Sequence, residues 1–146
     1  MANQLFIGTV LVLLTAVVHG SFIAAAVVGH RKLYDWFLKP PHFFKTMSAL
    51  TITISWVVVA HSIETWLWAF MFLWLGIFDA LEPAVYFALI SFTTLGFGDI
   101  ILEPKWRLFS GIAAANGLIL FGVSTAFLME IMRRLREHQG HKLGPS

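Results

Sequence analysis

The stretch SFTTLGFGDI, residues Ser91–Ile100, lies between two long apolar segments and holds two threonines, two glycines and an aspartate. A helix that faces lipid gains nothing from two glycines separated by one residue and followed by a carboxylate. Non-helical backbone is tolerated at membrane depth only where protein buries it or where it lines a water-filled cavity. The stretch therefore predicts a pore or a binding site.

The composition of the chain is typical of a membrane protein. Of its 146 residues, 58% are hydrophobic and only 12% are charged, far from the balance of a soluble domain. There is no cysteine, which excludes a disulfide framework and a thiolate metal site. The net charge of +2, with its bases at the ends of the apolar segments, favours contact with the membrane surface over a nucleic-acid partner.

Three apolar segments are long enough to cross a bilayer, which takes roughly 20 apolar residues. They are Leu5–Gly29, Met47–Phe78 and Trp106–Met132. The first has no basic leader and no small-residue cleavage site after a short apolar run, so it is interpreted as a helix and not as a signal peptide. The sequence predicts an all-α membrane protein with three transmembrane helices and a re-entrant segment between the second and the third.

The basic residues predict how these helices are oriented, because cytoplasmic loops carry an excess of Lys and Arg. Eight of the ten bases lie in two places, namely Arg31, Lys32, Lys39 and Lys45 after the first segment, and Arg133, Arg134, Arg136 and Lys142 after the third. We expect both places to be cytoplasmic. The N-terminus and the acidic segment around SFTTLGFGDI should then lie outside the plasma membrane.

The loop after the first segment, HRKLYDWFLKPPHFFK (residues 30–45), mixes bases with Tyr34, Trp36 and Phe37. This composition suits an interfacial helix that Pro40 and Pro41 interrupt. It predicts an anchor on the membrane surface, with lipid sensing as the alternative.

The residues before the glycines, LEPAVYFALISF (81–92), form an apolar run that is too short to span the membrane. Pro83 is well tolerated in a first helical turn, so we expect a half-crossing helix followed by an extended return. Asp79 and Glu82 place negative charge beside its N-terminus, where they either cap the helix or concentrate cations. In the return, Gly96 and Gly98 permit backbone conformations closed to other residues, which allows successive carbonyl groups to point the same way.

The run Thr94-Leu95-Gly96-Phe97-Gly98-Asp99 closely resembles the selectivity-filter signature of the tetrameric potassium-channel family, Thr-Val-Gly-Tyr-Gly-Asp. The resemblance extends from residue 81 to about 132: Tyr86 and Phe87 match the aromatic pair of the family's pore helix, Trp106 and Arg107 match the start of its inner helix, and Gly117 and Gly122 match its hinge. Two departures are Ile90, where some members carry a glutamate, and Phe97, which lacks the tyrosine hydroxyl. The alternative interpretation of the glycines is a packing turn.

The resemblance implies a potassium channel with one extra N-terminal helix, which conducts K+ passively as a homotetramer and is not an enzyme. K+ would bind at Thr94, Leu95, Gly96 and Phe97, and no cofactor is expected besides the permeant ion. The chain would divide into the extra helix and cytoplasmic loop (1–46), the pore domain (47–132) and a short cytoplasmic tail (133–146). Phe121, Thr125 and Met129 recur every four residues and would line the cavity and gate, unless this face only packs against other helices.

Three ionisable residues, His19, His61 and Glu64, should lie at a similar depth inside the membrane, where such residues are costly and mark a function or a tight pair. His61 and Glu64 are three residues apart and therefore share a helix face. Three interpretations stay open, namely a hydrogen-bonded brace, a pH-sensitive gate, and a metal site of two histidines and one carboxylate.

Two functions compete with a potassium channel. A small membrane redox protein would hold haem between His19 and His61, with the glycines as a turn. A non-selective cation channel would be expected to have a disrupted Gly-x-Gly filter, which this chain keeps.

Two features concern helix packing. Ser21, Ala25 and Gly29 form a stripe of small residues that lets one helix approach another closely, and we expect the stripe to pack the first helix on the pore unit. Asn116 is polar within an apolar run, and it either braces the pore helix or faces the cavity.

Overall fold

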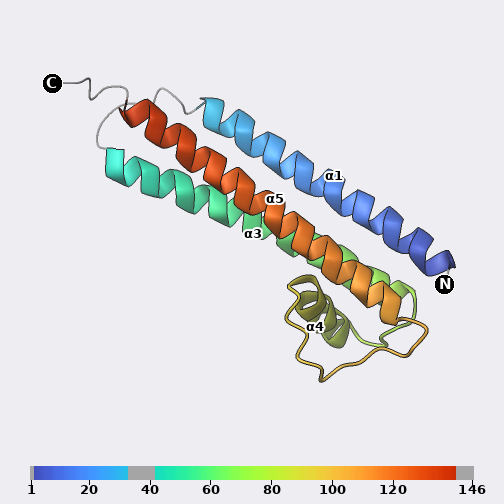
Figure 1. Ribbon diagram of the computed structural model, residues 1–146. Coiled ribbons are helices and arrows are strands. Elements are labelled where there is room, and N and C mark those ends of the chain that lie inside the picture. Colours follow the sequence, from blue (N-terminus) through green and yellow to red (C-terminus); the bar gives the residue numbers. More distant parts are fainter. Residues whose placement is uncertain (1, 33–41, 141–146) are drawn as a thin grey trace.

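The computed structural model describes residues 2–32 and 42–140, and it folds them into four helices (Figure 1). The long helices α1 (Ala2–Lys32), α3 (His42–Trp74) and α5 (Arg107–Gly140) contact one another, and the short helix α4 (Leu81–Phe92) packs on α3 and α5 at one end. Each long helix is long and apolar enough to cross a membrane, by length and composition. The predicted all-α fold with three long apolar helices is confirmed, while the interfacial loop around Pro40 lies outside the described residues.

Helix α3 ends at Trp74, earlier than the predicted Phe78. Gly76 has a φ of +63°, and its N–H donates to the carbonyl of Leu73 at 2.9 Å while the N–H of Ile77 donates to the carbonyl of Phe72 at 3.0 Å. These two bonds form a Schellman motif, which closes a helix with a glycine just past its end. The apolar run continues beyond the helix, and for this reason hydropathy alone placed the end of the helix four residues too late.

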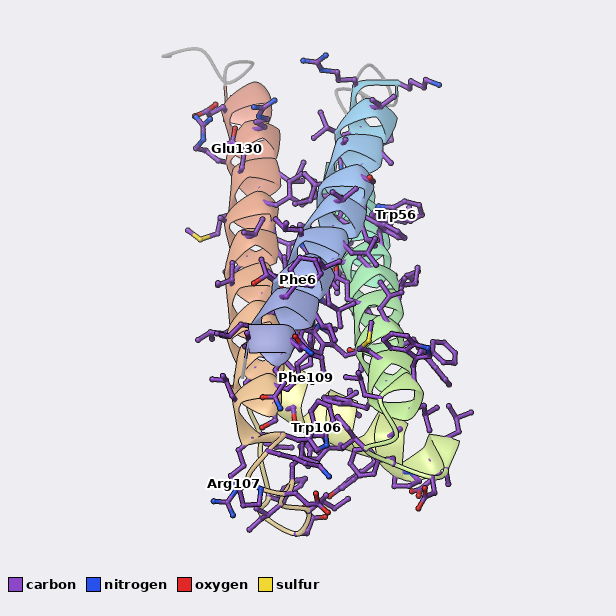
Figure 2. The ribbon with its side chains drawn as sticks, turned by 90° about the vertical axis from the view of Figure 1, so that its right-hand side faces the viewer. Phe6, Trp56, Trp106, Arg107, Phe109 and Glu130 are labelled. Carbon is purple, nitrogen blue, oxygen red and sulfur yellow. The ribbon has the colours of Figure 1, made fainter. Side chains whose placement is uncertain are left out.

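Helix α5 continues beyond the predicted end at Met132 as far as Gly140. Its last turns carry ion pairs at helical spacing, with Arg133 bonded to Glu130 at 2.8 Å and to Glu137 at 2.6 Å. Side chains three and four residues apart are neighbours on a helix, so these pairs favour helix where the sequence predicted a tail. Figure 2 shows Glu130 at the opposite end of the bundle from Trp106 and Arg107.

An aromatic core lies where α4 meets α3 and α5. Trp68 and Phe72 of α3, Phe92 of α4 and Phe109 of α5 are completely buried. The ring of Phe72 packs edge-on against those of Phe87 and Phe109, with centroids 5.4 and 5.7 Å apart. Aromatic side chains bury a large area each, so this core fixes α4, and with it the point from which the glycine-containing return starts.

Helix α1 packs through a face that the sequence did not predict. Its buried residues are Gly8, Leu11, Thr15 and His19. A Cβ atom on Gly8 would lie 2.9 Å from the side chain of Ile112 on α5, so this glycine lets α1 pack tightly on α5. The predicted packing of the first helix on the pore unit is confirmed, since α1 contacts α3 and α5. Within the chain this contact does not use the small-residue stripe, because Ser21 and Ala25 are exposed and no atom lies within 4 Å of the place of a Cβ on Gly29.

A buried hydrogen bond explains the rotation of α1. The side-chain amide of Asn116 on α5 donates to the hydroxyl of Thr15 at 2.8 Å, and that hydroxyl donates in turn to the carbonyl of Val12. Buried polar groups must be paired, so Thr15 has to face α5. Both predictions for Asn116 are therefore wrong, since it braces α1 and not the pore helix or a cavity.

Candidate functional site

The return after α4 is a loop of residues 93–99, here called the glycine loop, and all seven residues are exposed within the chain. Its start folds back on the helix that precedes it. The N–H groups of Leu95 and Gly96 donate to the carbonyl of Ile90 at 2.9 and 3.1 Å, and that of Thr94 donates to the carbonyl of Ser91 at 2.9 Å. The loop thus uses the free carbonyl groups at the end of α4 and still turns away from the core.

Positive φ angles recur at every second residue of the glycine loop, with +59° at Thr94, +48° at Gly96 and +79° at Gly98. Glycine adopts such angles freely, whereas a threonine pays of order 1–3 kcal/mol. The two glycines therefore occupy the unusual conformations for which the sequence singled them out. Strained backbone of this kind clusters at functional sites, which makes the loop the leading candidate.

The far end of the glycine loop is tied to α4 by a side chain. The hydroxyl of Tyr86 donates to Oδ2 of Asp99 at 2.6 Å. This bond holds the pKa of Asp99 below its usual range and raises that of Tyr86. Because Ile90 offers Asp99 no polar partner, Tyr86 supplies the contact, a role that the sequence alone did not indicate.

Gly117 allows α5 to lie directly on the end of α4. A Cβ atom on Gly117 would be 1.9 Å from the carbonyl oxygen of Phe92, which no side chain can tolerate. A Cβ on Gly122 would have no atom within 4 Å. Close packing against Phe92 is therefore sufficient to explain why residue 117 is a glycine. The predicted hinge at Gly117 and Gly122 stays a prediction.

The three residues predicted to line the cavity have different surroundings. Met129 and Thr125 are exposed within the chain, and the Thr125 hydroxyl donates to the carbonyl of Phe121 at 2.9 Å. Phe121 is 37% exposed, and one face of its ring stacks on His61 with centroids 4.2 Å apart. Phe121 therefore connects this face of α5 to the buried histidines.

His19, His61 and Glu64 come together from two helices, and Ser124 of α5 joins them. The Nδ1 atoms of His19 and His61 lie 2.9 Å from Oε1 and Oε2 of Glu64, respectively. The Nε2 atoms lie 3.2 and 2.9 Å from the hydroxyl oxygen of Ser124. These four side chains, all buried, form a closed ring of hydrogen bonds, here called the His–Glu–Ser ring.

The geometry of the ring bears on the metal and haem interpretations. The two histidines and Glu64 offer three donor atoms within 4.8 Å of one another, and no fourth His, Cys, Asp or Glu joins them among residues 2–32 and 42–140. All four imidazole nitrogens already contact Glu64 or Ser124. The imidazole centroids are only 5.2 Å apart, and Glu64 and Ser124 each bridge the two imidazoles. The arrangement therefore does not fit a haem between the two histidines.

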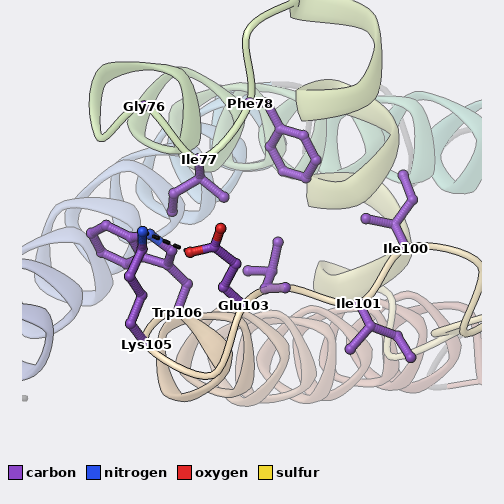
Figure 3. A pocket seen from close by; sticks show the side chains of 9 residues that line it. Gly76, Ile77, Phe78, Ile100, Ile101, Glu103, Lys105 and Trp106 are labelled. Atoms are coloured by element: carbon purple, nitrogen blue, oxygen red, sulfur yellow. Dashed lines mark ion pairs between the residues drawn. The ribbon is translucent and has the colours of Figure 1, made fainter.

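A small pocket of about 180 Å³ lies beside the turn after α3 and the segment before α5 (Figure 3). Glu103 and Lys105 form an exposed ion pair of 2.6 Å at this pocket. The pocket is smaller than typical ligand sites of about 300–1,000 Å³, so it provides no second candidate.

The geometry defines a helical membrane protein in which a short helix and an exposed glycine loop are inserted between two spans. Residues 46–134 match the sequence model of a family described as ion channels, with two transmembrane helices and a pore loop. The match covers more than half of the chain, from α3 to the last turns of α5, and the chain belongs to this ion-channel family, which is not a family of enzymes. No curated protein and no solved structure matches the chain.

The two glycines of α5 provide a matched test of the packing at the end of α4. We expect Gly117→Ala to lower the thermal stability of the protein in detergent, because overpacking typically costs about 1–3 kcal/mol. Gly122→Ala should show no such loss, since the added methyl group meets no atom. Equal Tm values for the two variants would contradict the close packing of Gly117 on Phe92.

The bond between Tyr86 and Asp99 sets a pH window. The lowered pKa of Asp99 means that the bond stabilises the folded protein above about pH 4 and is lost as pH falls through that lowered pKa. Because the pKa of Tyr86 is raised, the stabilisation by this bond is complete up to about pH 10, the ordinary pKa of tyrosine, and is lost only as pH rises through the raised pKa. In a carboxyl NMR titration we expect Tyr86→Phe to raise the pKa of Asp99. An unchanged titration would show that Tyr86 does not hold Asp99.

Proposed function

We propose that the protein is a potassium-selective channel in which four copies of the glycine loop line one pore. The observation that carries this proposal is the glycine loop itself, which is exposed along its whole length and still held at both ends. Hydrogen bonds to Ile90 hold its start and Tyr86 holds Asp99 at its end. A rigid loop rich in backbone polar groups belongs in a membrane protein only where it meets other chains or water.

Homotetramer assembly follows from the number of loops. One chain supplies one glycine loop, whereas carbonyl rings that replace the water shell of K+ are built from four. Cyclic symmetry places identical loops around one axis. Thr94, Leu95, Gly96 and Phe97 of each chain then contribute the carbonyl oxygens that bind dehydrated K+, and the permeant ion is the only cofactor.

In this assembly α4 is a re-entrant pore helix. The N-terminus and the glycine loop lie outside the plasma membrane, and the C-terminus of the chain is cytoplasmic. The carboxyl end of α4 carries roughly half a negative charge and points toward the central cavity, where it stabilises a cation. Below it, Phe121, Thr125 and Met129 line the cavity and the gate, with Gly117 and Gly122 as the hinge.

Acidic residues gather cations at the outer mouth. Asp99 lies at the end of the glycine loop, and its bond to Tyr86 keeps its pKa below the usual range, so it stays ionised to lower pH. Asp79 and Glu82 add charge near the start of α4, while Glu103 contributes less because it is paired with Lys105. A non-selective cation channel is the second candidate, because Phe97 lacks a hydroxyl that could brace the loop, but the intact pair of Gly96 and Gly98 favours a selective filter.

The test is a flux measurement on the full chain in liposomes. We expect K+ flux to exceed Na+ flux strongly, and Gly96→Ala to abolish it, because alanine cannot readily adopt the φ of +48° at this position. Gly20→Ala is the matched control, since Gly20 lies on an exposed face of α1 where a Cβ meets nothing within 4 Å. Equal K+ and Na+ flux would favour the non-selective channel, and flux that survives Gly96→Ala would contradict the filter.

A further inference from the structure

The His–Glu–Ser ring joins the three long helices and contains no residue of the glycine loop. It takes His19 from α1, His61 and Glu64 from α3, and Ser124 from α5. We propose that this ring is a proton-binding site that links α1 to the pore helices. In the linked state its two imidazoles and its carboxylate together carry three protons. This is one proton more than two neutral imidazoles and an ionised carboxylate carry.

The number of protons follows from the four contacts. An ionised carboxylate only accepts hydrogen bonds, so both Nδ1 atoms must carry hydrogen to bond Glu64. The Ser124 hydroxyl has one hydrogen and donates to one Nε2 atom only. The second Nε2 atom must carry a hydrogen of its own and donate to Ser124. One histidine is then neutral and the other positively charged, which balances the charge of Glu64.

Moving the extra proton onto Glu64 leaves the total unchanged, since each of the four contacts still holds one hydrogen. With one proton fewer, two lone pairs face each other in one contact and the ring carries a buried negative charge. With one proton more, the ring carries a buried positive charge and has five hydrogens for four contacts. Buried charges without a partner are strongly unfavourable, so the site selects the state with one extra proton.

No other titratable group of the described helices faces the ring. In α1, His19 is the only titratable residue before His30, and α5 has none between Arg107 and Glu130. In α3 the nearest, apart from the ring itself, is Lys45, sixteen residues before His61. In α4, Glu82 and Tyr86 lie at least six residues before Phe92, the residue of α4 whose aromatic ring approaches His61. The charge of Glu64 therefore has no counterion besides the two imidazoles.

A proton satisfies this site better than a divalent cation. A divalent cation beside one carboxylate would leave a net positive charge among apolar helices, whereas one proton leaves the ring neutral. A cation would also need lone pairs that the 2.9 Å contacts to Glu64 already occupy with hydrogen. The distances thus describe hydrogen bonds between the side chains themselves.

The ring is positioned to act on α5. His61 contacts α5 twice, through its bond to Ser124 and through its stacking on Phe121. Loss of the shared proton would break one contact and charge the interface of α1, α3 and α5. An effect on conduction rests on the proposed function, in which α5 is the inner helix, but proton binding itself does not.

The first test counts protons on the full chain in lipid. Solid-state NMR of the imidazole nitrogens of His19 and His61 and of the Glu64 carboxyl group at pH 6.5 should find three hydrogens in total on these three side chains. A sum of two or of four at pH 6.5 would overturn the proposal. This count needs no variant, so it remains decisive even if substitutions in the ring prevent folding.

Two controls define the site. Glu64→Gln should remove the extra proton, so that both imidazoles become neutral at pH 7.5. His30→Gln should leave the count unchanged, because His30 also bonds α1 to α3, through Thr53 at 3.2 Å, but is not a member of the ring. Stoichiometric Zn2+ binding that displaces the ring protons and is lost in Glu64→Gln would overturn the proposal in favour of a metal site.

The second test measures K+ flux in liposomes at pH 6.5 and pH 8.5. We expect a change of at least about fivefold in the native protein, in the range of typical couplings between sites. The change should disappear in Glu64→Gln and persist in His30→Gln. An equal pH response in Glu64→Gln would overturn the coupling to α5, whereas a lack of flux at both pH values would contradict the proposed function and leave the proton count to decide the site.

Discussion

Backbone and side-chain polar groups must find partners inside a membrane, and this constraint organises the whole chain. The carbonyl groups at the end of α4 find their partners locally, because they accept hydrogen bonds from the N–H groups of residues 94–96. Beside these bonds, α5 lies against the end of α4, and Gly117 permits this close approach at the carbonyl of Phe92. The glycine loop is consequently held in place by backbone contacts and by Tyr86, while its own surface stays exposed within the chain.

The same constraint determines how α1 docks. A stripe of small residues would allow α1 to approach closely on one face, but the polar groups lie on the other. Thr15 bonds Asn116, and one helical turn later His19 enters the ring with Ser124. These two pairs follow one another along the interface of α1 and α5, so pairing buried polar groups outweighs the closer packing that Ser21, Ala25 and Gly29 offer.

Much of the fold and the outline of the site could be predicted from the sequence, because both depend on local patterns. Length and hydropathy identify three spans, and the spacing of Gly96 and Gly98 identifies the loop. The contacts that the sequence did not predict depend on how the helices and the loop are placed against one another. The partners of Asn116, Tyr86 and Ser124 lie 101, 13 and 63 or more residues away, and no local pattern reports such contacts. The end of α3 was missed for a different reason, since Gly76 lies inside an apolar run that continues past the helix.

The most direct measurement of the central claim is a structure of the assembled protein in lipid with Tl+ or Rb+ as an electron-dense substitute for K+. The account predicts four chains around one axis, with cation density between the carbonyl groups of Thr94, Leu95, Gly96 and Phe97. An assembly in which the glycine loops do not meet at an axis, or cation density only elsewhere, would contradict it.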